Sequence, residues 1–580
     1  MTFLDRMIPR PALKWIRSAY AIARPRATIV IAWVIDSAPI VGRAAIVRRN
    51  RTVLPPYREL HSLRGDLARI FAALTLAVIC LLYGFFFGLT APSLIVAFVA
   101  PIFVLSALII WALPHQRTAP TLGIEFLYPA FFVALVAWPN YVAISLPGVP
   151  WITMLRLLGL PMVMLLLFSL SVSPAFQQRT HESVNGISLS WIFMRGFIIV
   201  QILTLILSQS AGASAQLVFN DQVYFTAIFV IGSVIFRKIA NVEKYWVLLC
   251  LLSVPIMIIL QIESSEKHLP WMNTIPEFLQ VHDATVQRIL SPSFRAGTNF
   301  FRAKATFSTQ LETAQYLGLL TPFLLYFGFY KRRLVTKILS FAMIPAIFIS
   351  IRLTDSRLGL VAMLVSFLLY GTLWSIIRWR SRPGDLLAAA VVYAYPAVFI
   401  GGIAVVMASH TLHDMVFGGG AQASSNAARD TQLQMAWKSF SKAPWGHGAG
   451  QDGSAMGYAQ VSQITVDNYF IALLLDYGAL GILFWYGMFI VAIVEATRCS
   501  ISDRYAGTRE AALLAPLAVA LTAFLVVKWV HAGDYGHSVA YMMLGMVSAL
   551  VFNLRKRLST ENPSFGKTAV RVQSRGSRYR

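Results

Sequence analysis

Three arginines stand out in a chain whose other long segments are largely apolar. Arg302 lies just before an apolar run, Arg429 lies in a long polar segment, and Arg357 follows Asp355 and Ser356. A guanidinium group presents a planar set of donors that matches phosphate oxygens, and it stays charged when partly desolvated. We therefore expect Arg302, Arg429 and Arg357 to bind a phosphate or diphosphate group.

Each arginine also has a structural explanation that the sequence leaves open. Arg302 and Arg429 could form ion pairs with carboxylates of their own loops. Ser356 or Asp355 could cap the helix that begins there, since both residue types are favoured at that position. An arginine at a helix N-terminus opposes the helix dipole, which favours a further role for Arg357.

Two positions are candidates for a general base. Asp467 and Asn468 begin an apolar run, where the carboxylate could accept a proton from a hydroxyl and the amide could orient the reacting groups. A helix N-cap is the alternative role for Asp467. His447 lies between Gly446 and Gly448, in a polar turn, and is the second candidate base.

The chain carries none of the common metal or nucleotide motifs. It has neither a GxxxxGK[ST] loop nor a GxSxG turn, and its three cysteines do not have metal-ligand spacing. We therefore expect neither a metal nor a cofactor, and we expect arginines to stabilise any developing negative charge.

Composition predicts an all-α, polytopic helical membrane protein. Of 580 residues, 57% are hydrophobic and 13% are charged, with a mean hydropathy of +0.65. Repeated apolar runs of about 20 residues are typical of membrane helices. We predict fourteen spans, of which the sixth is short, at residues 68–88, 93–113, 122–146, 149–172, 187–207, 223–236, 245–262, 313–330, 335–351, 358–377, 386–408, 468–494, 511–530 and 538–554.

The basic residues predict the orientation of these spans. With a cytoplasmic N-terminus, cytoplasmic segments hold 36 of the 49 Lys and Arg residues and outer segments hold 10. Cytoplasmic loops of membrane proteins are enriched in Lys and Arg, so both termini are predicted to be cytoplasmic. The net charge of +24 therefore indicates topology and attraction to anionic lipid, and not nucleic acid binding.

The spans divide the chain into seven regions. Two long outer loops are the main departures from a simple bundle, and loops of this length are usually functional or disordered. The regions are a basic cytoplasmic or interfacial segment (1–67), N-terminal spans (68–262), a first outer loop (263–312), central spans (313–408), a second outer loop (409–467), C-terminal spans (468–554) and a basic tail (555–580). Within the outer loops we predict a short helix in VHDATVQRIL. We predict a second helix, opened by Arg429 and ending at Pro444, with Arg429, Leu433, Ala436, Trp437 and Phe440 on one face.

Four segments in order resemble the O-antigen ligase and polymerase family of bacterial envelopes. They are RAKATFSTQLETAQYLGLLTPF, SRLGLVAMLVSFLLYG, RDTQLQMAWKSFSKAPWGHGAG and DNYFIALLLDYGALGILFW, and together they cover about residues 300–490. The resemblance implies transfer of a glycan from undecaprenyl diphosphate to an acceptor hydroxyl, with inversion and without metal, at the outer face of the bacterial inner membrane. It also implies that Arg302 and Arg429 hold the diphosphate.

The chain departs from this family where a His-Asn pair is usual, because Asp467 takes the place of the histidine. This departure favours a polymerase of repeat units over a ligase to lipid A-core. A flippase for lipid-linked glycans, another transporter and a non-catalytic assembly scaffold are the alternatives. The expected partners are the undecaprenyl-diphosphate-linked glycan and membrane lipid, with other polysaccharide assembly proteins as further candidates.

Overall fold

The computed structural model describes most of the chain after residue 118. The described residues are 119–145, 151–295, 300–331, 333–382, 384–409, 423–457 and 468–561, together with Leu105 and Val466. The chain divides into units 1–90 and 91–580, and every described residue belongs to the second unit. The predicted regions at 1–67 and 68–88, the span at 93–113 except for Leu105, and Asp467 lie outside the described residues.

The described part of the chain is helical, with two isolated antiparallel bridges, Ile144 to Ile152 and Phe294 to Phe301. Five short 3-10 or π segments accompany the helices: η4 (Asn185–Ile187), η5 (Leu205–Leu207), η6 (Gln222–Thr226), η7 (Glu277–Leu279) and η9 (Asp503–Tyr505). The helices are α4 (Thr121–Ala137), α5 (Met154–Val172), α6 (Pro174–Val184), α7 (Ser188–Thr204), α8 (Ala211–Asp221), α9 (Ala227–Ile235), α10 (Ile239–Glu266), α11 (Ala284–Leu290), α12 (Gln310–Tyr330), α13 (Leu334–Leu353), α14 (Arg357–Ser381), α15 (Leu386–Ala408), α17 (Ala423–Lys442), α18 (Asp452–Ala455), α19 (Tyr469–Ile501), α20 (Arg509–Lys528) and α21 (His537–Glu561).

The protein is a polytopic helical membrane protein. Among the described residues, nine helical segments are long and apolar enough to cross a membrane, and α4 is a shorter apolar helix. The predicted total of fourteen spans stays a prediction. The predicted short helix in the first outer loop is confirmed as α11.

The third and the sixth predicted spans differ in length from the structure for reasons that local contacts explain. The third ends at Ala137, because Trp138 precedes Pro139 and adopts extended backbone angles (φ −106°, ψ 123°). The sixth is longer than predicted: α8, the π turn η6 and α9 form one apolar segment, Ala211–Ile235.

The long sixth segment is possible because its polar side chains pair with Gln201 of α7. The Gln201 amide of α7 donates to the Asp221 carboxylate at 2.7 Å, and the Gln222 amide donates to the Gln201 side-chain oxygen at 3.0 Å. These bonds satisfy groups that would otherwise be costly to bury. The polar interruption around Asp221 therefore does not end the helical segment.

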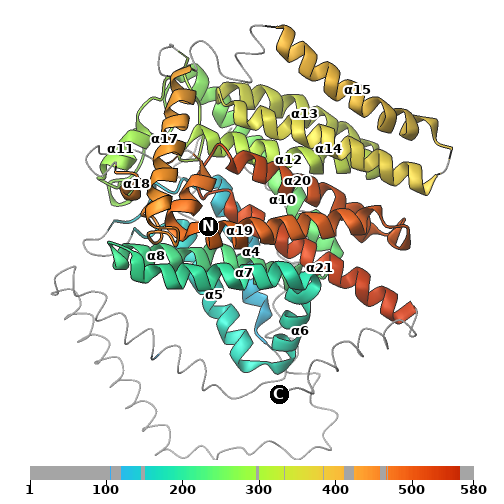
Figure 1. Cartoon of the computed structure of the whole chain (residues 1–580), viewed down its shortest axis with the longest axis horizontal. Coiled ribbons are helices and arrows are strands. Elements are labelled where there is room, and N and C mark those ends of the chain that lie inside the picture. Colours follow the sequence, from blue (N-terminus) through green and yellow to red (C-terminus); the bar gives the residue numbers. More distant parts are fainter. Residues whose placement is uncertain are drawn as a thin grey trace, which may run out of the picture. The chain divides into compact units, whose positions relative to one another are not determined.

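Helices α12, α20 and α21 form the centre of the bundle. Every residue of α12 from Glu312 to Gly328 is buried, and α12 packs against α10, α13, α14 and α20 (Figure 1). A helix that is apolar on all sides is typically enclosed by others. The enclosed position of α12 fixes its neighbouring helices relative to one another.

Small residues allow α12 and α14 to approach closely. A Cβ placed on Gly318 would lie 2.9 Å from the Ala362 Cβ, and a Cβ on Gly359 would lie 2.8 Å from the Ala314 carbonyl oxygen. Close backbone approach at small residues is a common way for membrane helices to associate. This contact holds the beginning of α14, and with it Arg357, against the beginning of α12.

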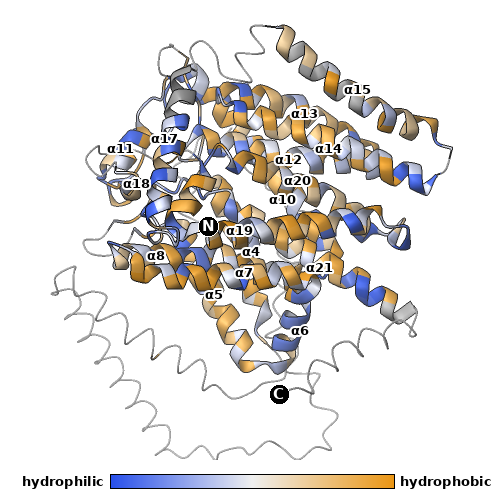
Figure 2. Ribbon diagram, in the orientation of Figure 1, coloured by the Kyte–Doolittle hydropathy of each residue, from blue (hydrophilic) through white to orange (hydrophobic). Residues whose placement is uncertain are grey.

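The loops gather at two opposite ends of the bundle. The segments that carry α11, α17 and α18 lie at one end, at the left in Figure 1, and α6 and the end of α21 lie away from them. Figure 2 shows apolar residues along the helices and hydrophilic residues at the ends, including α6 and the last turns of α21.

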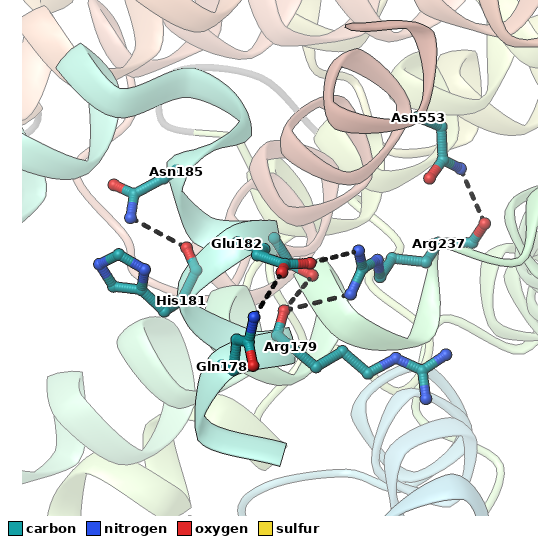
Figure 3. Close-up of polar contacts among 8 residues, drawn as sticks. Gln178, Arg179, His181, Glu182, Asn185, Arg237 and Asn553 are labelled. Atoms are coloured by element: carbon teal, nitrogen blue, oxygen red, sulfur yellow. Dashed lines mark hydrogen bonds and ion pairs between the residues drawn. The ribbon is translucent and has the colours of Figure 1, made fainter. Parts of the chain in front are cut away.

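Arg237, between α9 and α10, ties α6 to α21 at the end that carries α6 (Figure 3). Its guanidinium group donates to the Glu182 carboxylate at 3.0 Å and to the Arg179 carbonyl oxygen at 3.3 Å. Its own carbonyl oxygen accepts from the Asn553 amide at 2.8 Å, and its Cζ lies 4.2 Å from the centre of the Phe552 ring. One side chain thus joins two helices that are far apart in sequence.

Candidate functional site

A short hairpin between α11 and α12 carries Arg295 and Arg302. Phe294 and Phe301 form an antiparallel bridge, and their rings meet edge to face at 5.6 Å. The Arg302 amide donates to the Ser293 carbonyl oxygen at 2.9 Å. Because side chains alternate across extended strands, Arg295 and Arg302 project from the face opposite to the two phenylalanines. The hairpin therefore presents two guanidinium groups on one side.

Glu263, at the end of α10, fixes the segment that follows Arg302. Its carboxylate accepts the backbone N–H groups of Lys304 at 3.0 Å and of Ala305 at 2.7 Å. Ala305 has a positive φ of 52°, which an alanine adopts only when its surroundings impose it. The Ala303 amide also donates to the Leu353 carbonyl oxygen of α13 at 3.1 Å. The hairpin is thus fastened to both α10 and α13.

Asp355, in the turn between α13 and α14, forms an ion pair with Arg295. One Arg295 Nη lies 2.9 Å and 3.1 Å from the two carboxylate oxygens. Asp355 has a φ of 47°, a left-handed conformation that is rare outside glycine and asparagine. The turn is therefore shaped so that the carboxylate reaches the arginine hairpin.

The predicted cap of α14 is only partly correct. Ser356 is the N-cap residue, but its side chain makes no capping bond. Its hydroxyl oxygen is buried and has no hydrogen-bond partner among the described residues. The neighbouring Asp355 binds an arginine and does not cap the helix either. The capping explanation therefore does not account for these polar residues, and Arg357 begins α14 directly beside them.

The structure connects the predicted phosphate-binding residues through Arg295. Arg302 interacts electrostatically with Arg295 and Asp355, and Arg357 interacts with Arg295, Arg429 and Asp355. Arg302 and Arg429 are thus linked by way of Arg295 and Arg357. Four guanidinium groups from the hairpin, α14 and α17 form the arginine cluster: Arg295, Arg302, Arg357 and Arg429.

The arginine cluster is positively charged and partly dehydrated. Burial lowers the pKa of Arg302, Asp355 opposes this shift, and Arg295 adds to it. The Nε atoms of Arg302 and Arg429 are buried and lack hydrogen-bond partners among the described residues. Arginine stays protonated in proteins, so these groups remain charged donors. The cluster suits an anion with several oxygens, such as a diphosphate.

Nothing in the sequence around Arg295 distinguishes it from Arg288, which lies outside the cluster on α11. Its position depends on the Phe294–Phe301 pairing and on Asp355, which is 60 residues away in sequence. Glu263 was likewise missed, since a carboxylate at the end of a membrane helix is a common interfacial residue.

Helix α17 begins earlier than predicted. It begins at Ala423, so Arg429 lies inside the helix and does not open it. Ala436 is buried against Ile471 and Leu475 of α19, whereas Leu433 and Trp437 are exposed. The contact of this part of α17 with α19 is therefore made by a small side chain, whereas the larger Leu433 and Trp437 side chains remain exposed.

The glycine turn after α17 is built into a break in α19. Gly478 interrupts α19 with φ 66° and ψ −163°. There the His447 amide donates to the Leu475 carbonyl oxygen at 2.8 Å, and the Gly448 amide donates to the Asp476 carbonyl oxygen at 2.9 Å. The turn therefore uses carbonyl groups that the broken helix leaves without their usual partners.

Asp476 lies at this break and has a structural role. Its two carboxylate oxygens accept the backbone N–H groups of Gly450 at 2.8 Å and Gln451 at 2.9 Å. The carboxylate is buried. A carboxylate in a membrane helix is a functional candidate by default, and in this helix it fastens the glycine turn that carries His447.

Of the two candidate bases, the structure describes His447 but not Asp467. Asp467 lies outside the described residues, and the N-cap of α19 is Asn468, whose side-chain oxygen accepts the Phe470 N–H at 2.8 Å. Asn468 therefore has the capping role that was considered for Asp467. The half-buried His447 places Nδ1 2.9 Å from the Leu475 carbonyl oxygen. Because a carbonyl can only accept, Nδ1 carries the proton, which leaves Nε2 as the acceptor of a neutral ring.

Comparison with known families adds one match. A family model described as O-antigen ligase matches residues 346–486, and no curated protein matches the chain. The matched segment runs from α13 into α19 and includes Arg357, Arg429 and His447. The resemblance to this family is confirmed over this segment, and the chain is similar there to O-antigen ligases. Among the described residues, no group of three His, Cys, Asp or Glu side chains could hold a metal ion.

Proposed function

From this family match we propose that the protein polymerises glycan repeat units carried on undecaprenyl diphosphate into a surface polysaccharide. The observation that carries the proposal is the arginine cluster, which joins the hairpin, α14 and α17 at one end of a membrane bundle. A diphosphate is a multivalent anion with oxygens to match several guanidinium groups. We place the reaction at the outer face of the bacterial inner membrane, where positive-inside topology puts these loops.

The proposed reaction is an inverting glycosyl transfer. An acceptor hydroxyl attacks the anomeric carbon of the donor, a new C–O bond forms, and the bond to the diphosphate oxygen breaks. The electron pair leaves with the diphosphate, whose growing negative charge Arg302 and Arg429 would stabilise. Donors placed where charge develops typically contribute the largest share of such catalysis. Arg357 would hold the same group from α14.

A base must take the proton of the acceptor hydroxyl. We propose Asp467, because it occupies the family's histidine position, with His447 as the alternative. Support for His447 comes from the 2.9 Å contact between its Nδ1 and the Leu475 carbonyl oxygen, which directs the basic Nε2 away from that carbonyl. Asn468 would contribute by capping α19 and so fixing the residue before it.

A ligase that transfers completed glycan chains to lipid A-core is the second candidate, because the matching family model is described as O-antigen ligase. The two functions predict different intermediates in cells without the protein. Single lipid-linked repeat units would accumulate without a polymerase, whereas full-length lipid-linked chains would accumulate without a ligase.

The test is a transfer assay with the purified full-length protein and the lipid-linked glycan extracted from cells that lack it. Arg302→Ala and Arg429→Ala should each lower the rate by about two to three powers of ten, as loss of one key donor does in other enzymes. Lysine at either position should restore activity only in part, because it lacks the planar fork. Asp467→Asn should abolish transfer if Asp467 is the base, and otherwise His447→Gln should.

Arg288→Ala is the matched control. Arg288 lies in the same outer loop but is exposed and outside the cluster, so this variant should transfer normally. Normal transfer by both cluster variants would contradict the proposed function. Absence of transfer by the unaltered protein would instead favour a non-catalytic scaffold or a transporter.

A further inference from the structure

The loop between α20 and α21, together with Lys528 at the end of α20 and His537 at the start of α21, contains a group of charged and polar residues outside the arginine cluster. Lys528 and His537 are fully buried and His531 is 6% exposed, whereas the Asp534 side chain is 64% exposed. This arrangement is unusual, because lysine side chains are normally exposed to water and Lys528 is buried.

The buried residues hold the loop in a defined conformation. The Lys528 ammonium group donates to the Gly533 carbonyl oxygen. His537 Nδ1 lies 3.0 Å from the Asp534 carbonyl oxygen and 3.2 Å from its carboxylate. Since the carbonyl can only accept, Nδ1 carries a proton and can donate to both oxygens. Asp534 is therefore an exposed carboxylate on a fixed support, which is the arrangement of a preorganised binding group.

Asp534 also lies among charged groups from other elements. It interacts electrostatically with Asp221 of α8, Asp452 of α18 and Glu312 of α12. It interacts in the same way with Tyr469, the first residue of α19. The carboxylate is thus accessible and surrounded by several helices, unlike an ordinary surface aspartate.

The charge of Asp534 is maintained by its neighbours. Although nearby atoms partly desolvate the carboxylate, the hydrogen bond from His537 and the charge of Lys528 lower the pKa of Asp534. His531 does not compete for the proton, because burial, Lys528 and His537 lower the pKa of His531 to about 3. At neutral pH the group is a carboxylate that can only accept hydrogen bonds.

The Asp534 loop adjoins both parts of the candidate site. Leu358, next to Arg357, packs in one apolar cluster with Val527, next to Lys528. On the other side the Lys528 Nζ lies 5.1 Å from the centre of the Tyr469 ring, one residue after the cap of α19. The loop therefore stands beside the beginnings of α14 and α19.

We propose that Asp534 contacts the acceptor glycan, accepting a hydrogen bond from one of its sugar hydroxyls and so orienting it towards the donor. The inference rests on the proposed function and assigns the acceptor side of the same reaction. Sugar hydroxyls are strong donors, and an ionised carboxylate binds a donor about twice as strongly as a neutral acceptor does. In this arrangement the arginine cluster binds the diphosphate of the donor. The Asp534 carboxylate supplies a hydrogen-bond acceptor for the hydroxyl groups of the uncharged acceptor sugar.

The experiment compares two properties of Asp534→Asn in the full-length protein in lipid nanodiscs. Transfer, measured with the lipid-linked glycan extracted from cells that lack the protein, should fall about ten- to a hundredfold, the effect expected for one hydrogen bond to a charged group. Binding of undecaprenyl diphosphate should stay within about twofold of the unaltered protein, because the arginine cluster is intact. Asp503→Asn, an exposed aspartate in η9, is the matched control and should change neither property.

The outcomes separate this inference from the proposed function. Equal transfer by Asp534→Asn and Asp503→Asn would overturn the inference alone, and so would an equal loss of transfer and undecaprenyl diphosphate binding. If Arg302→Ala keeps both properties, the proposed function fails and the acceptor role fails with it. Should Asp534→Asn not fold, Asp534→Glu tests the same point. It keeps the charge but displaces it, so lower transfer with normal undecaprenyl diphosphate binding supports the role, and unchanged transfer opposes it.

Discussion

Replacing Gly478 with alanine should separate the glycine turn from α19. A Cβ at this position would lie 2.2 Å from the Pro444 carbonyl oxygen, and the φ of 66° is unfavourable for any residue with a Cβ. With ψ −163° this backbone conformation is essentially restricted to glycine, and it alone costs another residue about 1–3 kcal/mol. If the turn moves away to relieve the contact, it loses the bonds from His447, Gly448, Gly450 and Gln451 to α19. At about 1 kcal/mol each, the loss of these four bonds adds about 4 kcal/mol, and together with the backbone conformation the cost is about 5–7 kcal/mol.

The assay is thermal unfolding of the purified protein in detergent, together with transfer of the lipid-linked glycan. Gly371→Ala is the control, because Gly371 lies in α14 with nothing within 4 Å of its added Cβ. That change should be neutral or stabilise the helix by up to about 1 kcal/mol. Gly478→Ala should unfold at a lower temperature and transfer poorly, since the turn carries His447. Equal unfolding temperatures for the two variants would refute the reasoning.

Two further variants test the supports of the site. Glu263→Ala leaves the Lys304 and Ala305 N–H groups without an acceptor, so it should lower the free energy of unfolding by about 2–6 kcal/mol and reduce transfer. Glu263→Gln keeps one acceptor oxygen and should lower the free energy of unfolding by less. Indistinguishable unfolding curves for these two variants would contradict this role. For His531 the folded-state pKa of about 3 lies below the unfolded value near 6.5, so the unfolded chain takes up a proton that the folded protein excludes. Stability should therefore fall as the pH drops from about 6.5 towards 3, and His531→Asn should flatten that fall in pH-dependent unfolding measurements, while an unchanged slope would exclude His531 as its source.

Hydropathy predicted well those helices whose first and last residues are determined by nearby sequence. The span predicted at 313–330 is α12, which begins three residues earlier because Thr309 and Glu312 form a capping box. The sixth span was too short in the prediction because Asp221 and Gln222 looked like a helix boundary. Their partner, Gln201, lies in the preceding helix, so the pairing could not be recognised from local sequence.

The sequence identified several individual residues of the candidate site, but it did not predict how they are arranged in space. Residue chemistry identified Arg302, Arg357 and Arg429. The path between Arg302 and Arg429 runs through Arg295 and the unusual backbone of Asp355, and both depend on contacts between distant segments. The role of Asp476 was hidden for the same reason, because its two partners lie in the glycine turn 25 and 26 residues before it.

The enclosed position of α12 has a consequence for biosynthesis. Of its packing partners, α10 precedes it in the chain, whereas α13, α14 and α20 are made later. Its buried Gln315 and Thr321 side chains would therefore face lipid when the helix first enters the bilayer, and polar groups there are costly. We expect newly made α12 to remain beside the insertion machinery until its later partners arrive.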